Sequence, residues 1–340
     1  MKILINGAGR IGRTLTRLLI DTKKINSIII NDPFLNINNL EYLLKYDSSY
    51  GKLNFDIKNN KNFLTINKKK IIIIKNKSLF TKKNLKILNS VNLVVDSSGI
   101  KKNHHQAKEI SSKVKGKILI THTYENADFH HIFGVTEYKK TNLAKIISCS
   151  ICDAVAIGPL LKILDNNFSI KKGNIVTLHP WLSYQNLNDG ISRSFAYPGE
   201  VIENFALGRA STEALIPKNT SCIKALKYFF PKIEKKIMSM SIRVPTPVVS
   251  SAIINLELDE QTNSIELSKI LKSYKNKQKQ KIFEINNEQI VSKDIISNPH
   301  SLIIDQRWTL INNFNCRFFI WYDNEFGYSS RVKDLILKII

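Results

Sequence analysis

The chain has 340 residues, of which 43% are hydrophobic, and a formal net charge of +23. This length favours two domains over a single small core. We find no apolar run long enough to span a bilayer and no signal-peptide pattern at the start, so we expect a cytoplasmic protein. The four cysteines are too few for a disulfide framework in a chain of this size.

The positive charge comes mostly from lysines that are dispersed along the chain among many Asn and Ile residues. Such dispersion favours a solvated basic surface over a dedicated nucleic-acid site, although it would still attract anionic, phosphorylated substrates. We interpret Lys58–Lys77 as a lysine-rich surface segment rather than a linker.

Residues 1–148 alternate short β-branched runs with helical patterns. This alternation predicts an α/β fold with a Rossmann-type, doubly wound parallel sheet. The expected buried strands are Ile28–Asp32, Ile71–Ile74, Leu93–Asp96 and Lys117–Ile120, and the expected helices are Arg13–Asp21 and Asn38–Lys45.

The pattern changes after residue 148. A helix is predicted over Asp153–Leu164, whereas Ile237–Arg243 and Ala252–Leu258 alternate polar with apolar residues, which is typical of antiparallel strands with one covered face. We therefore expect an α+β catalytic domain with a mainly antiparallel sheet over 149–323. The last residues, 324–340, are expected to return to the first domain, residues 1–148.

The segment Gly7–Gly12 reads G-x-G-x-x-G between a predicted strand and a predicted helix. Its glycines permit a tight turn, the approach of a pyrophosphate and close packing of helix and strand. Asp32 ends the next strand, where a carboxylate would bind a ribose 2′-OH and repel a 2′-phosphate, so NAD is the expected cofactor. The expected contacts from the turn are Gly7, Gly9, Arg10, Ile11 and Gly12.

Cys149 lies thirty residues before His179. A cysteine that a histidine converts to a thiolate can attack a carbonyl carbon, which points to an aldehyde trapped as a thiohemiacetal. The alternatives are a small core cysteine and a hydrogen-bonded core histidine. Cys149 and Cys152 form a C-x-x-C, but no second Cys or His pair accompanies it, so we expect no metal.

The sequence resembles the phosphorylating glyceraldehyde-3-phosphate dehydrogenase family, collinearly over nearly the whole chain. The resemblance implies that Cys149 attacks the aldehyde with its backbone N–H helping to hold the oxyanion, that His179 acts as base, and that Asn324 orients the nicotinamide. It also implies cofactor contacts from Ser98 and Tyr328, and a homotetramer. The segments that carry it are Ile5–Arg13, Tyr42–Ser48, Asp96–Gly99, Ser148–Cys149, His179, Ile242–Pro247 and Trp321–Tyr328.

The substrate side departs from the family pattern. Leu182 and Tyr184 stand where the family has phosphate-binding threonines, while the matching cation, Arg243, is present. The loop 186–208 is longer than usual and contains Arg193, which could replace a phosphate contact. The expected substrate and phosphate contacts are Ser148, Ser150, Tyr184, Arg209, Thr220, Ser221 and Arg243.

The expected reaction is the NAD-dependent oxidation of glyceraldehyde 3-phosphate, with phosphate, to 1,3-bisphosphoglycerate, although water could also cleave the thioester. A paralogue acting on another aldehyde, such as erythrose 4-phosphate, is the alternative that Leu182 and Tyr184 support. A non-catalytic NAD-binding or nucleic-acid-binding paralogue is the third hypothesis.

Overall fold

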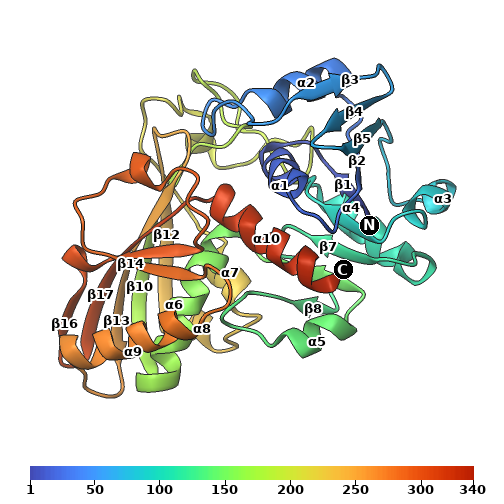
Figure 1. The fold of residues 1–340 in the computed structure, drawn as a ribbon. Coiled ribbons are helices and arrows are strands. Elements are labelled where there is room, and N and C mark those ends of the chain that lie inside the picture. The colour runs from blue at the N-terminus through green and yellow to red at the C-terminus, as the bar shows by residue number, and fades with distance from the viewer.

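The computed structural model describes all residues, 1–340, as two β-sheets with their covering helices. Helix α10 (Phe326–Ile339) runs between the two sheets and packs against helix α1 (Arg10–Ile20), so the end of the chain returns to its beginning (Figure 1). The exact domain boundaries that we expected remain a prediction. No helix is long and apolar enough to cross a membrane.

The first sheet has nine strands in the order β3-β4-β5-β2-β1-β6-β7-β9-β8. From β5 onward, the strands of this order (β5-β2-β1-β6-β7-β9-β8) all pair in parallel with their neighbours. This confirms the predicted α/β fold. The strands are β1 (Lys2–Asn6), β2 (Ser27–Asn31), β3 (Ile57–Asn59), β4 (Phe63–Ile66), β5 (Lys69–Ile74), β6 (Leu93–Asp96), β7 (Lys117–Ile120), β8 (Phe129–His130) and β9 (Ile146–Ser148).

Alternate residues of the parallel strands enter two different cores, because successive strand side chains point to opposite faces. Ile3 and Ile5 pack in the large core with residues of α1 and α10, whereas Leu4 packs in a smaller core with residues of α3 and α4. The remaining helices around this sheet are α2 (Ile37–Lys45), α3 (Leu85–Leu88), α4 (Lys101–Ile110) and α5 (Tyr138–Leu143).

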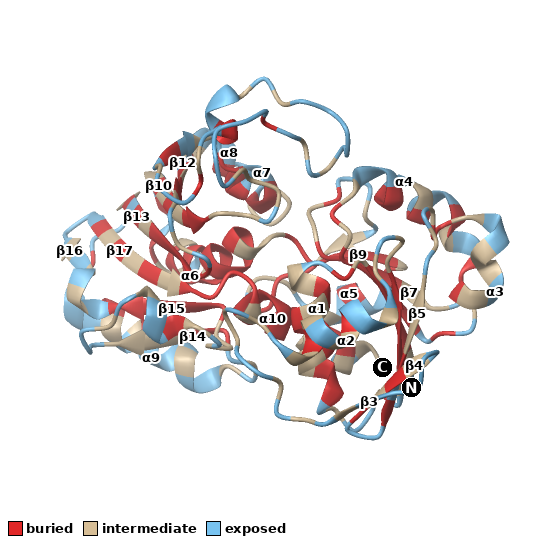
Figure 2. Cartoon of the chain, turned by 90° about the horizontal axis from the view of Figure 1, so that it is seen from above, coloured by how far each residue is buried: buried red, intermediate tan, exposed pale blue.

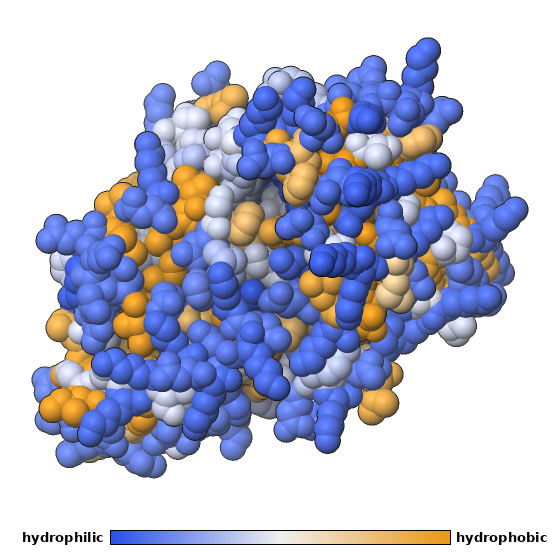
Figure 3. Space-filling view, viewed as in Figure 1, coloured by the Kyte–Doolittle hydropathy of each residue, from blue (hydrophilic) through white to orange (hydrophobic).

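The segment Lys58–Lys77 is more regular than we expected. It forms most of an antiparallel β3–β4–β5 meander at the edge of the sheet, with Leu64 and Ile66 fully buried. Its lysines are exposed except for Lys69, which is buried. The segment is thus lysine-rich and at the surface, as we expected, and its alternate apolar residues also supply a buried face. Hydrophilic side chains cover most of the face seen in Figure 3.

The second sheet has the order β11-β12-β10-β13-β17-β15-β14, with β16 beside β17. All its pairs are antiparallel except β10–β12 and β14–β15, which confirms the predicted α+β arrangement. The strands are β10 (Ile170–Pro180), β11 (Ile216–Lys218), β12 (Ile237–Val244), β13 (Ser250–Leu258), β14 (Phe283–Asn286), β15 (Leu302–Asp305), β16 (Leu310–Asn312) and β17 (Asn315–Tyr322).

Helix α6 (Cys152–Phe168) covers the inner face of the second sheet and is almost wholly buried (Figure 2). It starts one residue before the predicted helix, which places Cys152 in its first turn. The other helices are α7 (Cys222–Leu226), α8 (Ile233–Lys236) and α9 (Ser264–Lys277), and the 3-10 turns are η1 (Lys82–Asn84), η2 (Ser111–Lys113), η3 (Phe205–Gly208), η4 (Ser292–Ile295) and η5 (Gln306–Trp308).

Candidate active site

The glycine turn between β1 and α1 leaves room for a ligand only at its middle glycine. Gly7 has a φ of +96°, and a Cβ added there would lie 2.8 Å from the backbone Cα of Ser98. A Cβ on Gly12 would lie 2.0 Å from the carbonyl oxygen of Gly7, whereas one on Gly9 would meet no atom within 4 Å. Gly9 begins α1 as its N-cap, so the open space lies at a helix N-terminus, where a pyrophosphate fits.

Asp32 stands beside this turn, directly after β2. Its carboxylate accepts hydrogen bonds from the backbone N–H groups of Ala8, at 3.1 Å, and Phe34, at 3.1 Å. These bonds fix a partly exposed carboxylate at the carboxyl end of the sheet, where the ribose of a dinucleotide would lie. The residues therefore fit NAD, the cofactor that we expected.

The side chain of Arg10 is occupied by other protein groups. Its guanidinium lies 2.6 Å from the Asp47 carboxylate and 2.7 Å from that of Glu325, and these acidic partners raise its pKa above its ordinary value although burial lowers it. It therefore links the first domain to the segment before α10. A cofactor contact from Arg10 remains a prediction; its backbone lies in the first turn of α1.

Cys149 does not lie beside His179, so the pairing that we expected is wrong. Cys149 follows β9, and its backbone N–H donates to the carbonyl oxygen of Ile120 at 2.8 Å, so this N–H is committed to the sheet and cannot hold an oxyanion. The side chain is buried in the large core and lines a cavity of only about 10 Å³ with apolar neighbours such as Val155 and Tyr328. Burial raises the pKa of the Cys149 thiol to about 12.

The cysteine that faces His179 is Cys152. Its Sγ lies 3.6 Å from His179 Nε2, and the other ring nitrogen, Nδ1, lies 2.8 Å from the carbonyl oxygen of Pro180. A carbonyl can only accept, so Nδ1 carries the proton and Nε2 presents its lone pair to the thiol. This is the geometry of a nucleophile and its base.

Period-two alternation in the second sheet brings this pair together. On β10, Thr177 and His179 both point inward, toward α6, and on β12 Arg243 lies directly opposite His179 in the parallel register. On β17 alternate residues are also buried, and Tyr322 is the last of them. The carboxyl ends of these strands meet at one edge of the sheet, where α6 begins with Cys152.

Asp153 is a further member of this cluster that sequence reasoning did not identify. It is buried, its Oδ1 lies 3.5 Å from Cys152 Sγ and 3.9 Å from His179 Nε2, and it accepts a hydrogen bond of 2.9 Å from the Tyr322 hydroxyl. The signal available in the sequence was its position beside a cysteine in the first turn of a predicted helix, where an acidic side chain is favoured.

The environment keeps both reactive groups neutral in the free protein. Burial first, and then the Asp153 carboxylate, raise the pKa of the Cys152 thiol well above its ordinary value. Burial first, and then Arg243, lower the pKa of His179 to about 4. The thiol is consequently protonated near neutral pH and the imidazole is free to accept its proton as attack occurs.

Two cations lie near this cluster. Arg243 is buried, donates to the Pro180 carbonyl at 3.3 Å, and has an Nε without a partner. The second cation is Lys218, at the end of β11. Burial, and next Arg243, lower its pKa, although Asp153 and Cys152 act in the opposite direction. Lys218 was missed from the sequence because its run of residues shows no motif. A buried unpartnered donor beside a second cation is suited to an anion.

The other predicted phosphate contacts are scattered. Ser148 donates to the His122 carbonyl at 2.8 Å, and Ser150 lies in the turn before α6 with a φ of +60°. Thr220 accepts from the N–H of Cys222 at 3.0 Å. Ser221 is exposed at the start of α7. No hydrogen bond or ion pair joins any of these four to the Cys152 cluster.

The loop residues are also committed elsewhere. Arg209 is an exposed partner of Asp189, at 2.8 Å, and Tyr184 stacks on Phe195 with ring centroids 5.5 Å apart. Phe195 in turn lies over Gly99, at the carboxyl edge of the first sheet beside Ser98. Arg193 pairs its backbone with that of Val201 inside the loop. The loop thus reaches across to the nucleotide side of the same chain.

The remaining predicted cofactor contacts are Asn324, Tyr328 and Ser98. Asn324 is buried, and its side-chain oxygen accepts from the N–H of Val249 at 3.0 Å. The Tyr328 hydroxyl donates to the Ser150 carbonyl at 3.0 Å. Ser98 donates to Asp96 at 2.7 Å, which orients the end of β6. Their contacts with the cofactor remain predictions.

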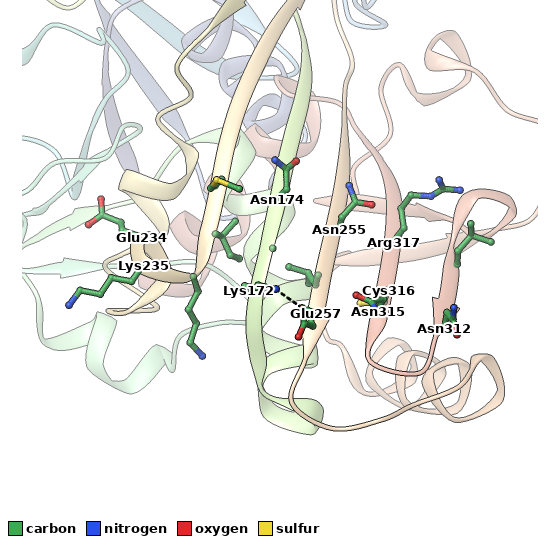
Figure 4. A pocket seen from close by; sticks show the side chains of 16 residues that line it. Lys172, Asn174, Glu234, Lys235, Asn255, Glu257, Asn312, Asn315, Cys316 and Arg317 are labelled. Carbon is green, nitrogen blue, oxygen red and sulfur yellow. Dashed lines mark ion pairs between the residues drawn. The ribbon is translucent and has the colours of Figure 1, made fainter.

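A cavity of about 740 Å³ lies away from these groups, on the outer face of the second sheet. Figure 4 shows Asn174, Asn255 and Arg317 on neighbouring strands of this face, with Lys172 paired to Glu257 at 3.0 Å. None of the residues of the Cys152 cluster lines it. This cavity is therefore separate from the candidate active site.

The dinucleotide-binding turn of the first sheet and the family matches of both parts of the chain define the class: the chain is an NAD-dependent aldehyde dehydrogenase of the phosphorylating type. It belongs to the glyceraldehyde-3-phosphate dehydrogenase family. Residues 1–104 match the NAD binding domain of glyceraldehyde 3-phosphate dehydrogenase, and residues 151–324 match its C-terminal domain.

Named relatives match the chain along almost its whole length. Glyceraldehyde-3-phosphate dehydrogenase of Danio rerio is 30% identical over 340 residues, covering 99% of this chain and 98% of the fish protein. Glyceraldehyde-3-phosphate dehydrogenase 3 of Saccharomyces cerevisiae is 28% identical over 337 residues, with the same coverage of the two chains. At this identity the fold, cofactor and reaction class are shared, and the chain is a divergent member.

Proposed function

We propose that Cys152 is the nucleophile of this enzyme, that His179 is its base, and that the substrate is a phosphorylated aldehyde, with glyceraldehyde 3-phosphate as the first candidate. The observation that carries the proposal is the distance of 3.6 Å between Cys152 Sγ and His179 Nε2, together with the burial of Cys149 away from both. A thiol and an imidazole within hydrogen-bond reach of each other are the usual arrangement of a nucleophilic cysteine and its base.

The first step forms the covalent adduct. His179 Nε2 takes the proton of the Cys152 thiol while the sulfur bonds to the aldehyde carbon, and the carbonyl oxygen becomes the oxygen of a thiohemiacetal. Backbone N–H groups in the first turn of α6 are available to this oxygen, since the first four N–H groups of a helix have no partner within it.

The second stage oxidises the thiohemiacetal and releases the acyl group as an acyl phosphate. NAD, when bound, would supply the hydride acceptor, and the thiohemiacetal on Cys152 would become a thioester when it loses its hydride. An oxygen of inorganic phosphate attacks the thioester carbon, the Cys152–carbon bond breaks, and His179 returns the proton to the sulfur. The product is an acyl phosphate, which for glyceraldehyde 3-phosphate is 1,3-bisphosphoglycerate.

The cations Arg243 and Lys218 support an anionic substrate. Erythrose 4-phosphate is the second candidate, because Leu182 has no side-chain donor and Tyr184 is stacked on Phe195. A lost phosphate hydrogen bond costs about 1–3 kcal/mol, which is enough to change substrate preference by roughly ten- to a hundredfold.

A paired set of variants tests the assignment. NADH absorbance is followed with each aldehyde, with and without phosphate, for the native chain and for Cys152→Ser and Cys149→Ser. We expect Cys152→Ser to lower kcat by about a thousandfold or more and Cys149→Ser to keep it within about threefold. Mass spectrometry of the acyl enzyme should place the acyl group on the peptide that contains Cys152. An acyl group on Cys149, or equal losses in both variants, would overturn the proposal.

The homotetramer, a cytoplasmic location and a place in glycolysis belong to the same proposal, because they follow from the family. Exposed apolar residues support an association of copies: Met238 is 73% exposed beside the outer face of the second sheet, and Phe205 is 77% exposed in the long loop. Light scattering after size-exclusion chromatography measures the mass directly, and a monomer at working concentration would contradict the tetramer.

A further inference from the structure

Cys152, Asp153 and His179 place three metal-ligand atoms in one triangle. The separations are 3.5 Å between Sγ and Oδ1, 3.6 Å between Sγ and Nε2, and 3.9 Å between Oδ1 and Nε2. We propose that these three side chains form a binding site for a zinc ion, which takes the catalytic thiol as a ligand and thereby blocks the reaction. The blocking rests on the proposed role of Cys152, whereas the binding does not.

The triangle has the dimensions of three corners of a tetrahedron around zinc. Bonds of about 2.3 Å to sulfur, about 2.0–2.1 Å to nitrogen and about 2.0–2.2 Å to oxygen hold tetrahedral ligand atoms roughly 3.3–3.6 Å apart. Two of the three observed separations already fall in this range, and the third exceeds it by a few tenths of an ångström. A small side-chain rotation of Asp153 or His179 closes that difference.

Two of the three ligands are oriented by hydrogen bonds of the kind found at zinc sites in proteins. His179 Nδ1–H donates to the Pro180 carbonyl, which fixes the ring and directs the Nε2 lone pair into the triangle. The Tyr322 hydroxyl donates to Asp153 at 2.9 Å and holds its carboxylate on the same side. All three ligands stand on backbone of regular structure, at the start of α6 and near the end of β10. The site is therefore preorganised rather than assembled from loops.

The two acidic ligands offset the charge of the ion beside Arg243 and Lys218. A zinc ion bound by a thiolate, a carboxylate and a neutral imidazole leaves the triangle with no net charge, compared with the single negative charge of the Asp153 carboxylate in the free protein. Binding releases the thiol proton to solvent, so affinity should rise as pH rises. In the free protein, Cys152 is neutral and Asp153 accepts its S–H. The zinc ion thus takes the place of the thiol proton that Cys152 shares with Asp153, and binds both side chains directly.

Three protein ligands leave the fourth position open, and Cys152 is the most exposed of the three, so the ion can enter from the substrate side. The sulfur lone pair that would attack an aldehyde is then engaged by the metal. Zinc and aldehyde should compete for free enzyme, and a chelator should restore activity. The zinc ion would act here as a reversible inhibitor of a thiol enzyme, and Asp153 would supply the third ligand that makes the site.

Metal binding to the full chain tests the site without reference to turnover. Protein freed of metal with a chelator is titrated with zinc by calorimetry, and with Co²⁺ by absorbance, where a cobalt–thiolate bond gives a charge-transfer band in the near ultraviolet. We expect one equivalent and the thiolate band in the native chain. Asp153→Asn keeps the shape and both other ligands, and should weaken binding at least about tenfold; Tyr322→Phe should weaken it by roughly ten- to a hundredfold.

Cys149→Ser is the matched control, since it removes a neighbouring buried thiol and leaves the triangle intact. It should bind zinc like the native chain, whereas Cys152→Ser should lose the thiolate band. Equal zinc affinity in the native and Asp153→Asn proteins, or a cobalt spectrum without the thiolate band, would overturn the site. Binding as expected in a protein that oxidises no aldehyde would reject the proposed function and leave the zinc site standing.

Discussion

The Cys152 thiol donates toward Asp153 Oδ1 at 3.5 Å, so the nucleophile that we propose is hydrogen-bonded to a carboxylate as well as facing the proposed base, His179. A negative charge at this distance disfavours the thiolate. The consequence is a resting site with a neutral thiol and a neutral imidazole, in which the proton moves only when the aldehyde is attacked. Asp153 therefore adds to the effect of burial in keeping the Cys152 thiol protonated.

Asp153→Asn should make Cys152 more reactive toward an alkylating reagent. Removing the carboxylate charge lowers the pKa of the Cys152 thiol, and one pKa unit corresponds to about a tenfold larger thiolate fraction below that pKa. The rate of iodoacetamide modification of the peptide with Cys152, measured by mass spectrometry between about pH 6 and about pH 10, should rise about tenfold near neutrality.

Cys149 in the same samples serves as an internal control, because burial alone raises its pKa and Asp153 is not among the causes. Its modification should stay slow in both proteins. An unchanged pH profile for Cys152 in Asp153→Asn would show that burial, rather than the carboxylate, suppresses the thiolate.

Gly7→Ala and Gly9→Ala should separate the fold of the nucleotide turn from its binding function. At Gly7 an alanine meets backbone at 2.8 Å with a φ of +96°, so the free energy of unfolding should fall by about 1–3 kcal/mol. At Gly9 nothing lies within 4 Å, so stability should be nearly unchanged while NAD binding weakens at least about tenfold, since the methyl group would occupy the pyrophosphate space. Urea denaturation and NAD titration by calorimetry measure the two effects; full NAD affinity in Gly9→Ala would contradict the assignment.

Asp32→Ser should relax the choice between NAD and NADP. The carboxylate now accepts from the Ala8 and Phe34 N–H groups and would repel a 2′-phosphate, while serine would keep a small acceptor without the charge. The ratio of kcat/KM for NADP to that for NAD should rise by about tenfold or more. Asn39 makes no hydrogen bond to the Asp32 carboxylate, since its N–H donates to Asn36 Oδ1. Asn39→Ser is therefore a control that should leave the NADP-to-NAD ratio of kcat/KM unchanged.

The sequence was sufficient for the fold because its signals are local and repeated. Buried runs such as Leu93–Asp96 pair in parallel with their neighbours, as expected, and Gly7 lies in the tight turn that the glycine motif predicted, with a positive φ. Asp32 lies beside the turn for the same reason, since the end of one parallel strand adjoins the next.

The reactive pair was misassigned because the difference between Cys149 and Cys152 is three-dimensional. Both cysteines precede a predicted helix, but only the helix start decides which one faces the inner side of the second sheet. Ser150, with its positive φ, turns the chain between them, so Cys149 points into the core and Cys152 toward His179. Lys218 and Tyr322 joined the site through strand pairing over long sequence distances, which no local pattern records.

The buried histidine His131 should make the protein less stable as the pH falls. Burial, and then Lys338, lower its pKa from 6.5 to about 4, and its Nδ1 lies 2.8 Å from the Thr141 hydroxyl. Between these two pH values the unfolded chain binds a proton that the folded chain does not, so the free energy of unfolding decreases as pH falls through this window and levels off below about pH 4. One such histidine contributes a slope of about 1.4 kcal/mol per pH unit.

His131→Asn removes this titration and keeps a polar group near Thr141, at some cost in packing. Urea denaturation at several values between about pH 7 and about pH 4.5 should give a pH slope shallower by about 1 kcal/mol per unit than that of the native chain, whatever the absolute stability. The exposed His105→Asn is the control and should keep the native slope. Because four other histidines have their pKa lowered to about 4 by burial, the native slope itself should be steep: His104, His122, His130 and His179. An unchanged slope in His131→Asn would mean that His131 has the same pKa in the folded and unfolded states.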